Sequence, residues 1–507
     1  MKKKGVLLRA GNEVPQQTGI RQICYLIVVT LLVGLSMILS TGISNDAGAQ
    51  AVSPTMTDPN LAVRTAVSGL VTPISMAFLK NNDIFVLEKS TGQVKRVLNG
   101  NITTVLDLGV NFNSERGLLG IALHPDFPAN PGVYLFWTCR TAAPPTDPFF
   151  QTQVRCDDAD MFAADTDTIL SVPLLGNRVD RFEWNGNSLS FDHNLIMLRA
   201  FQNDGAPVPP GQGDGAQPPR GNHDGGVLRF GPDGKLYILF GDNGRRGQLQ
   251  NLPCGPTANC PGPIQPDDQF GGPEPEDAHL SGVILRLNDD GSSPSDNPFF
   301  SAGAAIGGEV GANIQKIFAY GLRNSFGMAF DPVSGDLGEE ENGDDSFTEL
   351  NRVEAGFNSG WVQIMGPPAR VAQFKAIETR LDNDPCLGTP YFGLQQLRWS
   401  PALIADTPAQ ALSRLFVLPG SHYSAPEFSW KFEVAPAAIG FVKGRALGPQ
   451  FEGDLFVGSA RTFLEGGNLF HFNLTGNRRK IAVDNPRLED RVADNLTFHD
   501  MTESETL

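Results

Sequence analysis

A unit of turn, strand, turn and strand recurs along the sequence and constrains the fold more than any other feature. Its five copies are NNDIFVLEKSTGQVKRV from Asn81, NPGVYLFWT from Asn130, GPDGKLYILFGDNG from Gly231, DPVSGDLGEEENG from Asp331 and FEGDLFVGSARTFLEGGNLFHFNL from Phe451. Their spacing of roughly 50 or 100 residues matches the length of one four-stranded propeller blade. With 56 glycines, 38 prolines and 19% charged residues, the composition is typical of a turn-rich all-β protein. The repeats predict a β-propeller in which five blades can be counted.

Apolar runs within the copies, such as LYILF and DLFVGS, predict strands buried on both faces between neighbouring blades. Residues 203–222 and 253–277 are rich in Gly and Pro and interrupt the repeat as long loops. Two interpretations of these loops stay open: solvated linkers, or loops that rim a site at one mouth of the propeller.

The N-terminal region carries an export signal. Residues 23–43 are apolar and are followed by Ala49, Gln50 and Ala51. We expect residues 1–51 to be a signal peptide cleaved after Ala51, or an N-terminal membrane anchor with an apolar helix. Residues 52–60 are then a linker, and 61–507 form the propeller. The basic flank stays in the cytoplasm, which predicts an extracytoplasmic location, whether secreted, periplasmic or at the cell surface.

The formal net charge of the chain is −17. Such a surface repels phosphate backbones and carries no basic stripe, which argues against nucleic acid as a partner. Neutral small molecules are unaffected by this charge.

Cysteines outside the apolar run suggest disulfides rather than a metal site. Cys254 with Cys260, and Cys139 with Cys156, each bracket a loop, so that two loop staples would leave Cys386 unpaired. Zinc is the weaker interpretation, because no Cys-x-x-Cys motif or nearby His pair accompanies them.

Several stretches, taken together and in order, resemble the glucose/sorbosone dehydrogenase family. They are GLVTPISMAFL, ERGLLGIALHPDF, HDGGVLRFGPDGKLYILFGDNG, SGVILRLNDDGSSPSDNPF, YGLRNSFGMAFDPVSG, ENGDDSFTELNRVEAGFNSGW and VAPAAIGF. The resemblance implies a six-bladed propeller that holds pyrroloquinoline quinone (PQQ) with calcium and oxidises the anomeric hydroxyl of aldoses. His124, in HPDF, is best interpreted as part of a structural turn.

Oxidation of a carbinol by hydride transfer requires a base for the hydroxyl proton, and a neutral His near pH 7 suits that role. His223 follows a Gly-rich loop, precedes an apolar strand and matches the family's catalytic His. A structural His is the alternative. Asp242, in the GDNG turn, either orients that imidazole or caps its own turn.

A quinone with three carboxylates needs cations and amide groups around it. Arg323 and Asn324 of YGLRNSFGMAF meet that need, and the matching pair in the family contacts the quinone oxygens. Arg323 is also placed among the catalytic residues. Arg461 falls where family members place a cation facing the cofactor, commonly a Lys, so we expect it to substitute there.

ENGDDSFTELN offers the carboxylates, amides and carbonyls that calcium prefers. By the family match, the ligands are the carbonyls of Gly343 and Asp344 and the side chain of Glu349, with the ion as a Lewis acid. Thr348 stands where the family commonly has a second carboxylate, so Asp344 or Asp345 has to compensate. An acidic surface turn is the alternative.

The resemblance weakens after DRVADNLTFHD, where the family continues into a further repeat, so we expect the sixth blade to be incomplete. The sequence leaves three explanations: truncation, closure by a strand near residues 61–67, or loss of catalysis. The favoured function is an extracytoplasmic quinoprotein that oxidises aldoses with PQQ and calcium and passes electrons to an unidentified acceptor. A non-enzymatic extracellular binding propeller is the alternative. A calcium-dependent lactone hydrolase is disfavoured, because it would not need the Arg-Asn pair.

Overall fold

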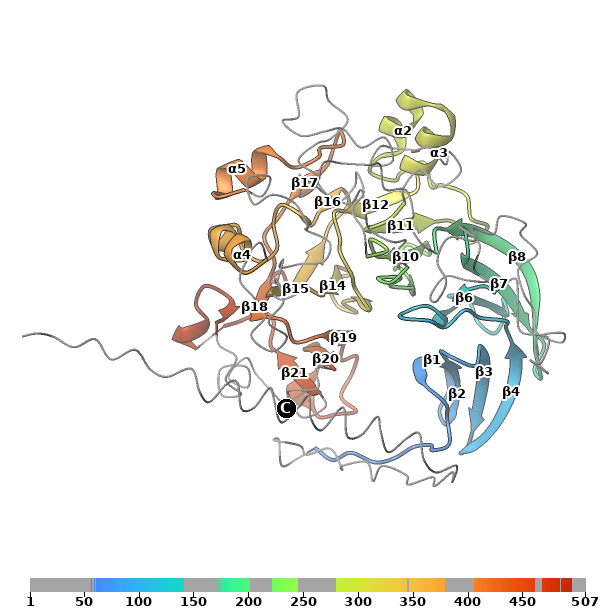
Figure 1. Ribbon diagram of the computed structural model, residues 1–507. Helices are drawn as coiled ribbons and strands as arrows, with labels where there is room; N and C mark the ends of the chain where they lie inside the picture. The colour runs from blue at the N-terminus through green and yellow to red at the C-terminus, as the bar shows by residue number, and fades with distance from the viewer. Residues whose placement is uncertain are drawn as a thin grey trace, which may run out of the picture. The chain divides into compact units, whose positions relative to one another are not determined.

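Tight turns reverse the chain between short apolar strands, and the strands pair into five sheets in the part of the chain that the structure describes (Figure 1). The structure is a computed structural model. The residues it describes are 56, 59, 61–140, 172, 175–200, 221–244, 280–343, 346–378, 405–460, 467–483 and 485–494. They belong to one compact unit, which spans Thr55–Thr379 and Gly393–Leu507.

The first two sheets are four-stranded antiparallel meanders, in the orders β1-β2-β3-β4 and β5-β6-β7-β8. Asn99 and Gly100, both with positive φ, form the two-residue turn between β3 and β4, which suits the twist of a hairpin. The strands are β1 (Pro73–Lys80), β2 (Asp83–Glu88), β3 (Gln93–Leu98), β4 (Asn101–Asp107), β5 (Leu118–Leu123), β6 (Gly132–Thr138), β7 (Asn177–Trp184) and β8 (Leu189–Leu198).

The other three sheets have six, five and three strands. In the third, β9 to β12 form an antiparallel meander, and β16 and β17 add to it in parallel. In the fourth, β13, β14, β15 and β18 are antiparallel, and β22 adds in parallel. These strands are β9 (Val227–Phe230), β10 (Leu236–Phe240), β11 (Val283–Leu287), β12 (Ile317–Tyr320), β13 (Gly327–Phe330), β14 (Leu337–Glu341), β15 (Ser346–Val353), β16 (Phe357–Asn358), β17 (His422–Tyr423), β18 (Phe428–Phe432), β19 (Pro436–Phe441), β20 (Leu455–Ser459), β21 (Asn468–Phe472) and β22 (Val492–Ala493).

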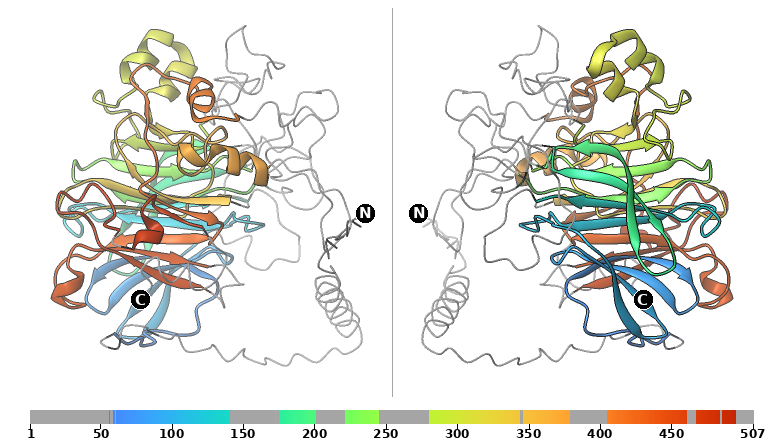
Figure 2. Two further views of the ribbon diagram at one scale, coloured as in Figure 1. Left: turned by 90° about the vertical axis from the view of Figure 1, so that its left-hand side faces the viewer. Right: turned by 90° about the vertical axis from the view of Figure 1, so that its right-hand side faces the viewer.

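The helices of the described residues are short and lie in connections between strands. Figure 1 and Figure 2 show α2 and α3 (yellow) side by side, in the connection that leads along the chain from β11 to β12. The helices are α2 (Phe300–Ile306), α3 (Gly308–Ile314), α4 (Val371–Glu378) and α5 (Pro408–Ser413), with 3₁₀ turns η3 (Pro368–Arg370), η5 (Pro449–Phe451) and η7 (Pro486–Leu488). None of the described helices is long and apolar enough to cross a membrane.

The first strand of each sheet contacts the first strand of the next: β1 with β5, β5 with β9, β9 with β13 and β13 with β19. Close approach is possible because glycines lie at these contacts. A Cβ added to Gly120 on β5 would meet the carbonyl oxygen of Gly226 at 1.9 Å. Five sheets in chain order, joined through their first strands, agree with the five repeats counted in the sequence.

The predicted burial of both strand faces is right for some strands and wrong for others. LYILF, which is β10, is fully buried between the second and fourth sheets. By contrast, β20 in DLFVGS alternates between buried and half-buried residues, because only one of its faces packs on the fourth sheet. On β1, Ile74, Met76 and Phe78 share one exposed face. The first and fifth sheets therefore each leave one face uncovered by the described residues.

Predictions for the two ends of the chain have mixed outcomes. The N-terminal apolar helix and the linker lie outside the described residues, apart from residues 56 and 59. Residues 61–71 form no strand, so they do not supply the closing strand considered above. Val492–Ala493 pairs with β18 of the fourth sheet instead of opening a sixth. Cys139 is disulfide-bonded, and every other cysteine lies outside the described residues.

Candidate functional site

A cavity of about 510 Å³ lies where the first strands of all five sheets meet. A cavity of this size suits a small-molecule ligand. Its lining includes β1, β5, β9, β13 and β19, together with the polar side chains of Lys89, Ser114, Glu115 and Arg229. The polar residues that could act on a bound ligand cluster around Glu115 and Gly225, near the points where these strands begin.

His223 and Asp242 form a buried pair beside this cavity. His223 Nδ1 and Asp242 Oδ1 are 2.6 Å apart, and the side chains are 5% and 0% exposed. Because an ionised carboxylate only accepts hydrogen bonds, Nδ1 carries the proton in this contact and Nε2 is left as the acceptor nitrogen. The Gly244 N–H also donates to Asp242 Oδ1, at 2.8 Å. Asp242 therefore both orients the imidazole and caps its own turn, the two roles between which the sequence did not decide.

The strand ends that carry His223, Asp242 and Arg323 meet at Gly241. The Asp242 N–H donates to the Arg323 carbonyl at 2.9 Å. A Cβ on Gly241 would meet the His223 carbonyl oxygen at 2.2 Å and the Arg323 carbonyl oxygen at 2.9 Å, so only glycine fits between the two segments. His223 itself has a φ of 59°, a strained conformation of the kind that often occurs at functional sites.

Arg323 and Asn324 follow β12 and are buried next to this pair. The Arg323 Nη1 group donates to the carbonyls of Asn342 and Gly343, at 2.9 and 3.0 Å. Its guanidinium carbon lies 5.5 Å from the centre of the Trp361 ring. Asn324 Oδ1 has no hydrogen-bond partner among the described residues and is available to a ligand.

Two residues that sequence reasoning missed complete the cluster. Glu115 Oε2 accepts from the His223 backbone N–H at 2.6 Å, and the carboxylate lies 3.3 to 3.4 Å from Asn324 Nδ2. Trp361 Nε1 donates to Asp242 Oδ2 at 3.0 Å. Glu115 stands in the ERGLLG motif and Trp361 in NSGW; both motifs belong to the stretches that resemble the family, but the sequence by itself indicates no role for either residue.

Asp224, the next residue after His223, is a fully buried carboxyl group. Its Oδ1 atom accepts from Asn177 Nδ2 at 2.8 Å. Burial raises the pKa of Asp224 from 3.8 to about 7, and the nearby Arg116 charge opposes that shift only in part.

This pKa predicts a pH-dependent stability that Asp224→Asn removes. Because the folded-state pKa is raised, the protonated group stabilises the fold fully below about pH 4, and this stabilisation is lost as the pH rises to about 7. We expect the free energy of unfolding of the native protein, relative to Asp224→Asn, to fall by up to about 4 kcal/mol over that range. Urea denaturation of both proteins at several pH values measures it, and parallel curves would contradict the assignment.

Three further carboxylates, Glu339, Glu341 and Glu349, are buried together on one face of β14 and β15. Asn351 Nδ2 lies between two of them, 3.2 Å from Glu339 Oε2 and 3.1 Å from Glu349 Oε2. Burial raises the pKa of Glu349 to about 7 and that of Glu339 to about 8. The acidic segment is therefore an interior feature of the fourth sheet, and the alternative of an acidic surface turn is wrong for Glu341 and Glu349.

The predicted calcium ligands are placed only in part. Glu349 accepts hydrogen bonds from Gly366 N–H and Asn351, and the Gly343 carbonyl accepts from Arg323. Within the described ranges, no group of three acidic, His or Cys side chains is arranged to hold a metal ion. Asp344, Asp345 and the predicted cofactor contact Arg461 lie outside the described residues, as do most of the two Gly- and Pro-rich loops.

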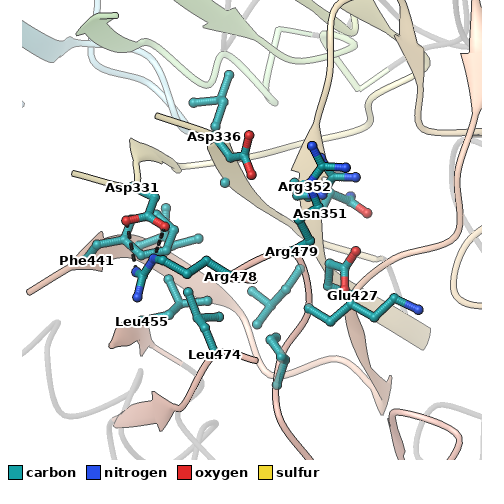
Figure 3. Close-up of a pocket in the computed structure, with 16 residues that line it drawn as sticks. Asp331, Asp336, Asn351, Arg352, Glu427, Phe441, Leu455, Leu474, Arg478 and Arg479 are labelled. Carbon is teal, nitrogen blue, oxygen red and sulfur yellow. Dashed lines mark hydrogen bonds and ion pairs between the residues drawn. The ribbon is translucent and has the colours of Figure 1, made fainter. Parts of the chain in front are cut away.

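A second, smaller cavity of about 40 Å³ lies between the fourth and fifth sheets (Figure 3). Its apolar floor includes Leu455 and Leu474. At its rim, Arg478 Nη2 pairs with Asp331 Oδ1 at 2.9 Å. This cavity has room for little more than water, and the strands that line it do not carry His223. We therefore interpret it as a packing defect between the two sheets and not as a ligand site.

The sheet arrangement is that of solved sugar dehydrogenases. A glucose dehydrogenase structure matches with a TM-score of 0.51 and 20% identity, covering 82% of this chain and 86% of that one. The apo form of the soluble aldose sugar dehydrogenase of Escherichia coli matches with a TM-score of 0.50 and 21% identity, covering 83% and 88%. At these identities the similarity shows a shared fold.

Sequence similarity adds the family. The profile of the glucose/sorbosone dehydrogenases matches residues 70–172 and 266–374, which include Glu115, Arg323 and Trp361 but not His223 or Asp242. Quinoprotein glucose dehydrogenase B of Acinetobacter calcoaceticus is 29% identical over 313 residues, 61% of this chain and 53% of that protein. An aldose sugar dehydrogenase of Escherichia coli K12 is 34% identical over 136 residues, 27% of this chain and 28% of that protein. Over these segments the chain is similar to the glucose/sorbosone dehydrogenase family, and it spans about half the length of the first of these relatives.

Proposed function

We propose that this protein is a PQQ-dependent dehydrogenase that oxidises the anomeric hydroxyl of aldose sugars. The observation that carries the proposal is the His223–Asp242 pair, set against Arg323 and Asn324 beside a cavity of about 510 Å³. Relatives named for glucose and aldose dehydrogenation support the substrate class, and the quinoprotein name supports the cofactor.

The residues fit a polyanionic quinone. Lys89 lines the cavity, and Asn324 Nδ2 lies within 3.4 Å of the lining residue Glu115. Asn324 Oδ1 and both side-chain polar atoms of Asn243 have no hydrogen-bond partner within the described ranges. We propose that Arg323, Asn324 and Arg461 hold the cofactor, which when bound supplies a two-electron acceptor for the hydride from C1 of the sugar. His223 Nε2 takes the proton of the anomeric hydroxyl, and the sugar leaves as a lactone. Asp242 keeps Nδ1 protonated, so that Nε2 faces the substrate as a base.

Calcium, location and electron acceptor belong to the same proposal. We propose Gly343, Asp344 and Glu349 as calcium ligands, on the family resemblance. An extracytoplasmic location, with residues 1–51 as signal or anchor, is supported by the disulfide at Cys139, because disulfides persist outside the reducing cytoplasm. The electron acceptor is then an extracytoplasmic partner.

We also propose that the complete fold is a six-bladed propeller. Its support is the chain of contacts from β1 to β19 and the single cavity that all five first strands line. The uncovered faces of the first and fifth sheets are where a sixth sheet would pack, since each would otherwise expose apolar side chains such as Phe78.

The test is reconstitution of the purified protein with PQQ, with calcium or with a chelator, followed by dye reduction with a panel of aldoses. We expect sugar-dependent dye reduction only with the quinone, and a higher melting temperature on its addition, because a ligand that binds the native state stabilises it. A loss of both effects in the chelator arm would support the calcium site.

The absence of both turnover and a quinone-dependent rise in melting temperature would reject the enzyme proposal. In that case, binding of the protein to extracellular partners without turnover would support the alternative of a non-enzymatic binding module.

A further inference from the structure

Trp361 is tied to the proposed base through the carboxylate of Asp242. Its indole Nε1 donates to Asp242 Oδ2 at 3.0 Å, while His223 Nδ1 contacts the other oxygen at 2.6 Å. The side chains of Trp361 and Asp242 are fully buried, so water does not compete for these hydrogen bonds.

The indole is itself held in place by the backbone around the site. The backbone N–H of Trp361 donates to the Gly321 carbonyl at 3.1 Å, just ahead of Arg323, and Phe374 packs edge-on against the indole, with the ring centres 6.5 Å apart. A ring fixed in this way determines where Oδ2 lies, and the carboxylate in turn determines the orientation of the imidazole.

The face of the same ring supports the Arg323 guanidinium, whose central carbon lies 5.5 Å from the ring centre. A cation over an indole face is attracted by the negative potential of the ring. One side chain thus contacts both the carboxylate that orients the proposed base and the cation proposed to meet the quinone.

We propose that Trp361 is a positioning residue that couples the two halves of the site: its N–H group orients His223 through Asp242, and its ring face positions Arg323. This inference rests on the proposed function. In this role, Trp361 contacts neither the sugar nor the hydroxyl proton and acts through Asp242 and Arg323.

Two substitutions separate the two roles. Trp361→Phe removes the N–H group but keeps a ring face for Arg323; we expect kcat to fall about tenfold, with KM and the PQQ dissociation constant within about twofold. Trp361→Leu removes both features, so we expect the same loss of kcat and, in addition, about tenfold weaker PQQ binding.

Trp137→Phe is the matched control. Trp137 is 1% exposed, and its Nε1 donates to the buried Asp180 Oδ2 at 2.7 Å, in the second sheet and without a histidine partner. This variant loses the same kind of hydrogen bond, so we expect a similar fall in melting temperature with kcat within twofold of the native value. Equal losses of kcat in Trp137→Phe and Trp361→Phe would overturn the positioning role.

A measurement that does not depend on turnover tests the hydrogen bonds that link Trp361, Asp242 and His223. In ¹⁵N-indole spectra of the cofactor-free protein, the Trp361 signal is the one that disappears in Trp361→Phe. We expect His223→Gly, which tolerates the positive φ and removes the donor to Asp242 Oδ1, to shift that signal and to leave the Trp137 signal in place, because the change reaches the indole through Asp242. An unmoved Trp361 signal would reject the coupling, whether or not the protein oxidises sugars. A moved signal in a protein without turnover would instead retain the coupling and reject the proposed function.

Discussion

Replacing His223 with asparagine is expected to lower kcat for aldose oxidation by about 10³-fold, because the variant has no group that can accept the hydroxyl proton at the position of Nε2. Asparagine is the informative substitution at this position. His223 has a φ of 59°, which Asn tolerates better than most residues, and the Asn amide can still donate to Asp242. The measurement is steady-state dye reduction, with quinone binding followed by titration.

Quinone affinity and melting temperature of this variant should stay close to those of the native protein. His422→Asn is the control, since His422 lies in the third sheet with its side chain 41% exposed. A kcat within tenfold of the native value would remove His223 from the role of base, and equal losses in both variants would point to a general effect on folding.

Asp242→Asn is expected to lower kcat by a similar factor of about 10³ and also to destabilise the fold. The carboxylate accepts from His223, from Gly244 N–H and from Trp361 Nε1. An amide has one acceptor oxygen in place of two, so its NH₂ group must face at least one of these donors. With the NH₂ group at the Oδ1 position, the imidazole is driven to the wrong tautomer, with its proton on Nε2; with the NH₂ group at the Oδ2 position, the Trp361 N–H loses its acceptor and no longer holds the side chain in place. We expect a loss of about 1–3 kcal/mol in the free energy of unfolding.

Asp180→Asn provides the comparison for this variant. Asp180 is 1% exposed and accepts from Trp137 Nε1 and from Asn194 Nδ2, so the substitution disturbs an equally buried network. It should reduce stability by a similar amount while kcat stays near the native value. If Asp242→Asn loses stability but not kcat, the aspartate is structural and the orienting role is wrong.

Features set by neighbouring residues in the chain were predictable from the sequence. Each repeat is a hairpin closed by its own turn, such as the Asn99–Gly100 turn after β3, so the count of five sheets follows from local patterns. Arg323 and Asn324 stood out because polar residues between apolar ones are seldom merely solvated, and both are buried. The proximity of His223 to Asp242 was suggested by their positions at the two ends of one repeat, which forms the β9–β10 hairpin.

Features set by packing between sheets were not predictable in this way. Glu339, Glu340 and Glu341 are consecutive acidic residues, a pattern typical of a solvated surface, yet all three are buried. DLFVGS looked doubly buried and is covered on one face only. In both cases the neighbouring sheet, which no local pattern encodes, decides whether a side chain meets water.

The sequence by itself determined the repeated strands, the class of fold and the segments from which the site is drawn, because turn geometry and strand formation depend on residues close together in the chain. Only the tertiary structure decided that Glu115 reaches the His223 backbone and that Trp361 reaches both Asp242 and Arg323. These contacts join residues as many as 119 positions apart. Glu115 and His223 precede the first strands of neighbouring sheets, whereas Asp242, Arg323 and Trp361 follow strands of the third sheet that are distant in the chain, so both contacts depend on strand pairing and sheet packing.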